Sequence, residues 1–405
     1  MHSPTAAKTE SPIPSLDPKV FQRIVALRRD LHSHPELSWE EQRTAAHISE
    51  YLDRLGIAHR DGVAGTGVVA DLPGPKGVPL VALRADTDAL PIHEETGLPF
   101  ASEVDGVMHA CGHDGHTSML LGAAELLARQ TRLATGVRLI FQPAEETGHG
   151  AKAMIDEGVL KNVGMIFGGH LDRHFSTGTI VVTDGAVNAS SDRFIIKIAG
   201  RGGHAARPHE AIDAVVVGSL LIMAIQTIVS REVNPAYPSV VTVGRFTAGT
   251  AANVIAATAR LEGTIRAQDA GVRSHLQRSI LRIAESVGQL HDARISAEII
   301  QGTPALINPR EMTELARQAA LEVVDPTHVR PMETANMGGE DFGWYMERVP
   351  GCYVRFGSQL EGHEGYPAHS SRFDFDENAL AVGARYFQAV ANVAGKQIAA
   401  RQKGS

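Results

Sequence analysis

The ten residues Met108–Thr117, with the sequence MHACGHDGHT, constrain the fold of this 405-residue chain more than any other stretch. Within six positions they place the thiol of Cys111, the imidazoles of His113 and His116, and the carboxylate of Asp114. Burying such groups without a partner costs free energy, so a segment that holds all of them needs something to bind them. Thiolate and imidazole are preferred ligands of zinc and related ions. The pattern therefore predicts a metal site.

An apolar run that favours a helix follows Thr117 and continues to about Gln130. The Cys/His cluster is therefore expected at the N-terminus of this helix, where the macrodipole stabilises thiolate and carboxylate over their neutral forms. The alternative is a loop whose histidines only cap the helix. Closely spaced cysteine and histidine favour the metal site over that alternative.

Three predicted strands end in acidic or imidazole side chains: Val78–Arg84 before Asp86 and Asp88, Val137–Pro143 before Glu145 and Glu146, and Gly164–His170. Binding sites of α/β sheets lie at the carboxyl ends of strands, so these side chains are expected to meet the Cys/His cluster. One glutamate of the pair can bind a metal while its neighbour moves protons. The alternatives are aspartates that only cap a turn and a solvated glutamate pair that begins the next helix.

Near the N-terminus, residues 1–18 are rich in Ser, Pro, Thr and Lys and are predicted to be a disordered lead-in. A helix is expected over Val20–Leu31. Ser38 and Glu41 have the spacing of a capping box, which predicts a second helix from Ser38 to Gly56.

The pattern changes near Val187, where strands with one polar face begin. The expected order β-α-β-β-α-β is that of a ferredoxin-like domain, with these elements: Arg193–Ala199, Ile212–Val229, Val240–Arg245, Thr258–Arg266, Val272–Gln289 and Ala293–Ile300. Helix–strand alternation resumes after Gly302. The prediction is an α/β fold with a mixed-sheet catalytic domain, residues 19–187 and 301–405, and an inserted ferredoxin-like domain, residues 188–300.

Composition narrows the classes of partner. The formal net charge is −8 and no strongly basic stretch occurs, which argues against a nucleic-acid partner. The two cysteines, Cys111 and Cys352, are far apart and form no disulfide framework, so a reducing, cytoplasmic location is expected. No apolar run is expected to reach the ~18 residues that span a bilayer, so no membrane partner is expected.

The chain resembles the amidohydrolase branch of the dinuclear metallopeptidase superfamily. Five motifs carry the resemblance, which covers nearly the whole chain after residue 18: Met108–Thr117, Pro143–Glu146 (PAEE), Gly202–His204 (GGH), Gly338–Asp341 (GGED) and His369 before Phe373. The branch contains hippurate hydrolases, N-acyl-L-amino-acid amidohydrolases and auxin–amino-acid conjugate hydrolases. The wider superfamily includes aminoacylase, carboxypeptidase G-type enzymes and dipeptidases.

The resemblance implies two divalent ions per subunit, Mn or Zn, with Co and Ni as alternatives. The implied ligands are Cys111, which bridges the two ions, His113, Glu146, His170 and His369. Glu145 would be the general base and acid, and Asp88 would support the ligands. Other branches have a metal-binding histidine at the position of Asp86, and that role would pass to His113. His116 is interpreted as structural.

The resemblance also implies that the inserted domain is a lid and a dimerisation surface. His204 would then reach the active site of the partner subunit in a homodimer. The family commonly has proline three residues after the histidine of the fourth strand, whereas this chain has His170-Leu-Asp-Arg173, so that wall of the pocket is altered.

The function predicted from these residues is hydrolysis of the amide bond of N-acyl-L-amino acids by a metal-activated water. Asn253 and Arg266 are candidates to bind the carboxylate of the amino-acid product, with ordinary surface polarity as their alternative. A metallo-carboxypeptidase or dipeptidase acting on small peptides is the alternative enzyme. A thiol hydrolase with Cys111 as nucleophile would leave Glu145, Glu146, His170 and His369 without a role. A non-catalytic metal-binding protein would not need Glu145.

Overall fold

The structure is a computed structural model that describes residues 13–360, 362 and 365–403, and these residues form two compact units. The large unit contains the chain up to Gly185, Asn308–Glu333, and the chain from Trp344 onward. The small unit contains Ala186–Ile307 and Thr334–Gly343. The predicted catalytic domain, which includes residues 301–405, contained the segment 334–343. Contacts place this segment in the small unit, because Asn336 forms a bridge to Asn188 and the side chain of Asn188 donates to the Gly338 carbonyl.

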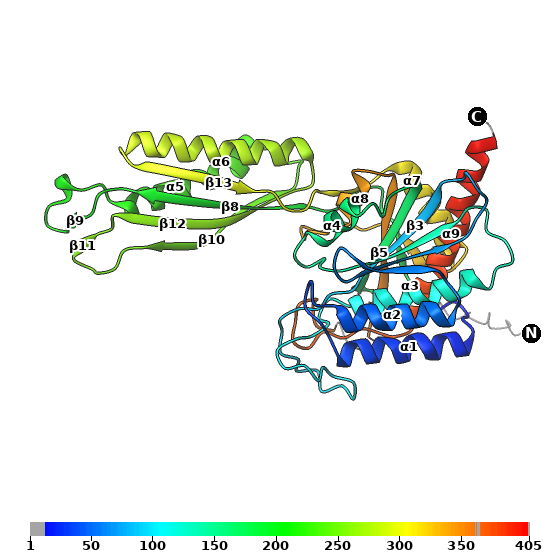
Figure 1. Ribbon diagram of the computed structural model, residues 1–405. Helices are drawn as coiled ribbons and strands as arrows, with labels where there is room; N and C mark the ends of the chain where they lie inside the picture. The colour runs from blue at the N-terminus through cyan, green and yellow to red at the C-terminus, as the bar shows by residue number, and fades with distance from the viewer. Residues whose placement is uncertain (1–12, 361, 363–364, 404–405) are drawn as a thin grey trace, which may run out of the picture. The chain divides into compact units, whose positions relative to one another are not determined.

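An eight-stranded mixed sheet forms the centre of the large unit (Figure 1). Its order is β1-β2-β4-β3-β5-β16-β6-β15. The strands are β1 (His59–Val63), β2 (Gly67–Leu72), β3 (Leu80–Asp86), β4 (Val137–Gln142), β5 (Val163–Ser176), β6 (Ile180–Val181), β15 (Val329–Arg330) and β16 (Gly351–Gln359). The four strands β4, β3, β5 and β16 pair in parallel, as expected for apolar strands that are covered on both faces.

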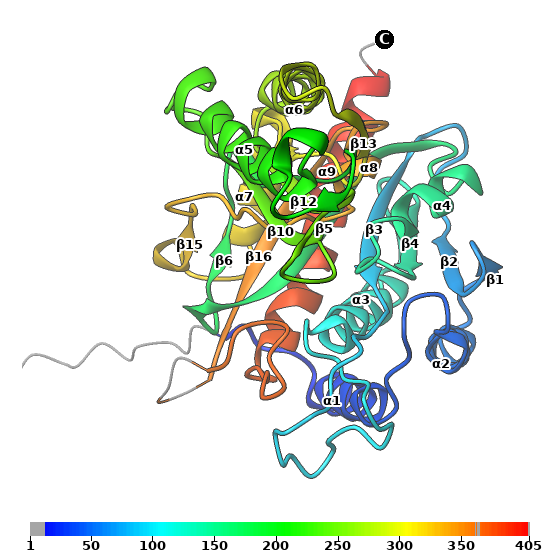
Figure 2. The same cartoon turned by 90° about the vertical axis from the view of Figure 1, so that its left-hand side faces the viewer.

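The helices of the large unit are α1 (Pro18–Ser33), α2 (Gln42–Arg54), α3 (His113–Ala128), α4 (Gly150–Asp156), α7 (Arg310–Leu321) and α9 (Ala379–Lys403), and the short α8 (Gly343–Met346) lies where the chain returns to this unit. Helix α3 packs between α1 and α9 and against β3 (Figures 1 and 2). Residues His113–Leu127 of α3 are all buried, as in a helix enclosed on every side. The site motif therefore begins a helix of the core.

Two expectations at the N-terminus were wrong. Helix α1 begins at Pro18, and the Asp17 side chain caps it by accepting the backbone N–H of Lys19 at 2.9 Å. The predicted lead-in therefore ends before Asp17, and residues 1–12 lie outside the described part of the chain. Helix α2 begins at Gln42, not Ser38, because the side chain of Glu36 accepts the N–H groups of the first turn.

The small unit contains an antiparallel four-stranded sheet of order β10-β12-β8-β13. In chain order its elements are β8 (Ser190–Ala199), α5 (Ala214–Thr227), β10 (Ser239–Ala248), β12 (Thr258–Ala267), α6 (Ala270–Leu290) and β13 (Arg294–Ile300). This order matches the predicted ferredoxin-like arrangement. A ribbon of β7 (Gly185–Asn188) and β14 (Leu306–Asn308) pairs the segments where the chain enters and leaves the unit, and β9 (Gly203–His204) pairs with β11 (Val254–Ile255).

Helix α5 and the short π-helix that follows it, Ile228–Glu232, have one buried apolar face and one exposed apolar face. Ala214, Val217, Leu221, Ile225 and Ile228 are buried in the core of the small unit, whereas Val215, Val216, Leu220 and Met223 are exposed. By length and composition alone, Ala214–Glu232 could cross a membrane, so the expectation that no stretch is long enough was wrong. The expectation failed because no charged residue occurs between Ala214 and Ser230.

Candidate metal centre

The strand register brings the predicted side chains to one level of the sheet. Asp86, the last residue of β3, pairs with Gln142 of β4. Leu83 of β3 pairs with Phe167 of β5, and continuing this register by three residues places His170 level with Asp86. The prediction that the strand ends at His170 was wrong, because β5 continues beside β16 to Ser176.

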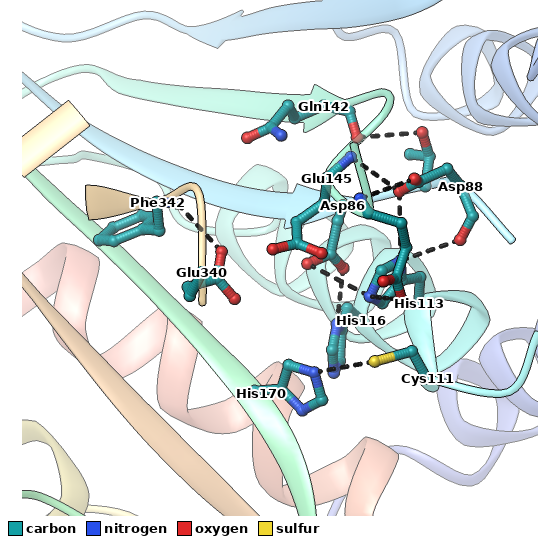
Figure 3. Close-up of polar contacts among 12 residues, drawn as sticks. Asp86, Asp88, Cys111, His113, His116, Gln142, Glu145, His170, Glu340 and Phe342 are labelled. Atoms are coloured by element: carbon teal, nitrogen blue, oxygen red, sulfur yellow. Dashed lines mark hydrogen bonds and ion pairs between the residues drawn. The ribbon is translucent and has the colours of Figure 1, made fainter. Parts of the chain in front are cut away.

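The five predicted metal ligands lie in two groups that share Cys111. Figure 3 shows three of them, Cys111, His113 and His170. Cys111, His113 and His170 form one group, and Cys111, Glu146 and His369 form the other. Within each group, all of the ligand atoms lie within 4.8 Å of one another. A thiolate common to both groups can bridge two ions, and thiolate, imidazole and carboxylate together suit zinc and neighbouring transition metals. The residues present therefore fit a dinuclear centre.

Backbone carbonyl groups orient two of the imidazoles. Nδ1 of His170 lies 2.7 Å from the Leu171 carbonyl oxygen, and Nδ1 of His113 lies 2.9 Å from the Asp88 carbonyl oxygen. Each Nδ1 can donate its proton there, which leaves Nε2 as the ligand atom. Nε2 of His170 lies 3.4 Å from the sulfur of Cys111. The buried Nε2 of His113 has no hydrogen-bond partner among the described residues, as expected of an atom reserved for an ion.

His369 has a backbone conformation that is uncommon for a residue with a side chain. Its φ of 68° lies in the left-handed region, and its N–H donates to the Ala110 carbonyl at 2.8 Å. Such strain collects at functional sites, where the surrounding structure enforces it. Nε2 of His369 lies 3.3 Å from Oε1 of Glu146, and this contact raises the pKa of His369.

Burial sets the protonation of the thiol and of one imidazole. Burial raises the pKa of Cys111 to about 12, so the thiol keeps its proton near neutral pH until a cation replaces it. Burial lowers the pKa of His170, which keeps this imidazole neutral and able to bind a metal. Burial opposes charge on His113 too, but the carboxylate of Asp86 and the contacts with Cys111 and Asp88 together outweigh it and raise the pKa. A protonated Cys111 is a poor nucleophile, which weighs against the thiol hydrolase.

Asp88 holds the loop that contains Glu145 and Glu146. Its Oδ1 accepts the N–H of Glu145 at 3.1 Å and its Oδ2 accepts the N–H of Glu146 at 3.0 Å. Ser38 donates its hydroxyl to the same Oδ2 at 2.7 Å. Glu145 lies in a group with His113 and Glu146, so its carboxylate is next to the ligands. The structure thus gives Asp88 a positioning contact with both glutamates.

His116 and Asp86 bind each other beneath the ligands. Nδ1 of His116 lies 2.6 Å from Oδ1 of Asp86, and Nε2 accepts the N–H of Leu171 at 3.0 Å. Both ring nitrogens are therefore occupied, which agrees with the structural interpretation of His116. The other carboxylate oxygen of Asp86 accepts a hydrogen bond from Arg84 at 2.7 Å.

The three predicted residues of the small unit lie at two ends of its sheet. His204 of β9 pairs with Val254 of β11, and the Asn253 carbonyl accepts the N–H of Ala205, so His204 and Asn253 are neighbours. Arg266 lies near the opposite end of β12, eight residues beyond Thr258, which corresponds to about 27 Å along the strand. Within one small unit, Arg266 therefore does not lie beside His204 and Asn253.

One acidic residue that the sequence motifs do not identify reaches this site. Glu41 is fully buried, and its carboxylate accepts the N–H of Ala144 at 2.9 Å across a sequence separation of 103 residues. Its position in the pattern Ser38-x-x-Glu41 predicts a helix cap instead. No local pattern identifies so distant a partner.

Comparison with known proteins identifies the family of this chain. Residues 82–393 match Peptidase family M20/M25/M40. The chain is 41% identical over 371 residues to the N-acetyl-L-cysteine deacetylase of Bacillus subtilis, covering 90% of this chain and 86% of that protein. It is 38% identical over 368 residues to thermostable carboxypeptidase 1 of Saccharolobus solfataricus, covering 89% and 92% of the two chains.

A solved structure shares the whole architecture. The crystal structure of a Bacillus subtilis protein described as a dinuclear metal binding peptidase of the M20 family superposes with a TM-score of 0.83 at 37% identity. The match covers 94% of this chain and 99% of that one. Relatives in this family are named for the hydrolysis of amide or peptide bonds, and this chain shares a fold with a member of the family. The protein belongs to the M20/M25/M40 peptidase family and is a hydrolase of amide or peptide bonds.

Proposed function

We propose that this hydrolase cleaves the amide bond of N-acyl-L-amino acids to give a carboxylic acid and a free amino acid. The observation that carries the proposal is the pair of ligand groups sharing Cys111, with Glu145 beside them. The proposed ligands are Cys111, His113, Glu146, His170 and His369, and the proposed ions are Mn or Zn, with Co or Ni as alternatives. Two bound divalent ions would lower the pKa of a water molecule toward neutrality.

Glu145 is the proposed proton carrier. It takes a proton from the attacking water and later delivers that proton to the departing nitrogen of the amide. Asp88 contributes by fixing the backbone at Glu145, because a general base must lie within hydrogen-bond reach of the proton it removes. The neighbouring Glu146 is left to bind metal.

Arg266 is the proposed partner of the substrate carboxylate. Its guanidinium is half-buried, which lowers its pKa, and it has no ion-pair partner among the described residues. It lies beside Gly339, where an added Cβ would stand 2.9 Å from Oγ1 of Thr303 and 3.5 Å from Nη1 of Arg266. The Thr303 hydroxyl is buried without a hydrogen-bond partner in the described structure. Gly339 therefore packs closely against a cation and a hydroxyl that lacks a partner, and two such groups near each other suit a carboxylate.

A homodimer in the cytoplasm is the proposed form of the enzyme. Arg266 lies about 27 Å along β12 from Thr258, and His204, with its neighbour Asn253, belongs to the separate β9–β11 ribbon. We therefore expect one substrate to take its second group from another subunit. The exposed apolar face of α5, which contains Val216 and Met223, offers a surface for that contact. His204 would then stabilise the oxyanion in the partner's site.

The test is a hydrolysis screen on protein stripped of metal with a chelator and reconstituted separately with Mn, Zn, Co or Ni. Stripped protein is expected to be inactive, and at least one ion should restore cleavage of N-acyl amino acids. Dipeptides are tested as well, because one relative is named a carboxypeptidase. Arg266 would bind the carboxylate of a dipeptide as well as that of an N-acyl amino acid. Faster cleavage of dipeptides would replace the proposal by a dipeptidase, and activity in verified metal-free protein would refute the metal mechanism.

A further inference from the structure

The segment from Glu36 to Glu41, before α2, lies against the strand end that carries Asp88. Leu37 forms a bridge with Ala89, and the N–H of Ala89 donates to the Glu36 carbonyl at 2.8 Å. The sequence pattern Ser38-x-x-Glu41 predicted a capping box, but neither side chain caps the helix. The cap comes from Glu36, whose carboxylate accepts the N–H groups of Arg43 and Thr44 at 2.9 and 2.8 Å. Ser38 and Glu41 are therefore free to act elsewhere.

Both side chains face the loop that contains the two glutamates of the site. Oε1 of Glu41 accepts the N–H of Ala144 at 2.9 Å, and the carboxylate of Asp88 accepts the N–H groups of Glu145 and Glu146. Three consecutive backbone amides thus donate to two carboxylates. Ser38 fixes the second carboxylate through its 2.7 Å hydrogen bond to Asp88.

Ala144 needs this support because its backbone is strained. Its φ of 54° lies in the left-handed region, where an alanine is uncommon and its conformation costs free energy. Its N–H is held by Glu41, and its carbonyl accepts the hydroxyl of Thr147 at 2.9 Å. Thr66 in turn donates its hydroxyl to Oε2 of Glu41 at 2.6 Å. Glu41 has no exposed surface, so water does not compete for its carboxylate.

We propose that Glu41 is a positioning residue for Glu145, acting through the backbone of Ala144 and assisted by Ser38 through Asp88. This inference rests on the proposed role of Glu145 as general base. The hydrogen bond sets the direction in which the chain leaves Ala144, and therefore where the Glu145 carboxylate lies. A base displaced by about an ångström loses on the order of 100-fold in rate, whereas substrate binding does not depend on it.

The test compares Glu41→Ala with Glu36→Ala, since both remove a buried or half-buried carboxylate from the same segment but only Glu41 contacts the loop. Amide hydrogen exchange is measured on the metal-free protein for a peptide spanning 143–149. Exchange in this peptide should rise about 10-fold or more in Glu41→Ala and stay unchanged in Glu36→Ala, because a buried hydrogen bond to a charged acceptor is lost only in the first.

Steady-state kinetics on the metal-loaded proteins gives the second readout, with the N-acyl amino acid that the wild-type protein cleaves fastest. Glu41→Ala should lower kcat about 10- to 100-fold with metal content and KM unchanged. Glu41→Gln keeps an oxygen that can accept the Ala144 N–H, so it should retain kcat within about threefold. If Glu41→Ala does not fold, Thr66→Val is used instead, because it removes only the hydrogen bond from Thr66 to the Glu41 carboxylate. It should raise loop exchange and lower kcat, each by a smaller factor.

Unchanged loop exchange and kcat in Glu41→Ala would overturn the proposal, as would an equal loss in Glu36→Ala. Glu145→Gln is measured in parallel to separate the two hypotheses. If Glu145→Gln remains active, the proposed function itself fails. If Glu145→Gln is inactive and Glu41→Ala is fully active, only the positioning role of Glu41 fails.

Discussion

The carbonyl oxygen of Asp88 lies 2.9 Å from Nδ1 of His113. A single residue that follows a buried strand therefore orients an imidazole of the site. The carboxylate of the same Asp88 accepts the N–H groups of Glu145 and Glu146. The imidazole and the loop with the two glutamates therefore share one support. Their relative positions are set by the fold before any ion binds, which reduces the reorganisation that binding requires.

Mutation should distinguish the role of Glu145 as proton carrier from that of Glu146 as metal ligand. Glu145→Gln is expected to keep its metal but lose turnover by about 10²- to 10⁴-fold, because it removes a proton carrier. Glu146→Ala and His170→Ala should lose metal, because each removes a ligand. Metal content by elemental analysis, measured beside kcat, checks this. An empty site in Glu145→Gln would show that the two roles were assigned wrongly.

Arg266→Ala should weaken substrate binding in a way that depends on the carboxylate. We expect KM for an N-acyl amino acid to rise about 10-fold or more, since a charge-assisted contact is lost. The matching N-acyl amino-acid amide has no carboxylate, so its cleavage should change little. An equal effect on both substrates would place Arg266 outside the carboxylate site. Gly339→Ala should act in the same direction, because its Cβ meets the Thr303 hydroxyl.

We expect Asp192 to make the folding stability of the small unit sensitive to acid. Burial raises its pKa, but the hydrogen bonds from Arg273, Gly302 and Gln277 and the charge of Arg273 together outweigh burial, so the net pKa is lowered. A lowered pKa stabilises the folded state above the unfolded pKa of about 3.9, and this contribution is lost as pH falls through the folded value. Asp192→Asn should therefore destabilise by about 3 kcal/mol at pH 7, and by progressively less below about pH 4, in urea unfolding. A difference independent of pH would contradict this assignment.

Action of His204 across a dimer can be tested by complementation. Glu145→Gln and His204→Ala proteins should each be inactive alone. If His204 serves the partner's site, a mixed dimer has one site with both changes and one with neither, so mixing under subunit exchange should regenerate activity. Absence of activity in a proven mixed dimer would exclude action in trans.

The sequence was sufficient where the signal is local. The apolar run after Thr117 identified helix α3, although the helix begins earlier, at His113, and the apolar runs before Asp86 and Glu145 identified the strands β3 and β4. Period-two alternation in Arg193–Ala199 identified a strand of the ferredoxin-like unit. The capping pattern at Ser38 failed, because Ser and Glu at this spacing bond to whichever N–H groups the fold brings near, and here these belong to residues on other segments.

By itself the sequence determined the α/β class, the inserted unit and the chemical types of side chain available for a metal site, because these depend on residues close together along the chain. Only the tertiary structure decided which of these side chains lie together in the candidate metal centre. The parallel register of β3 and β5 brings His170 level with Asp86, and the positive φ of His369 directs its imidazole toward Glu146. Such contacts join residues that are distant along the chain, and packing of the whole sheet and its helices selects them.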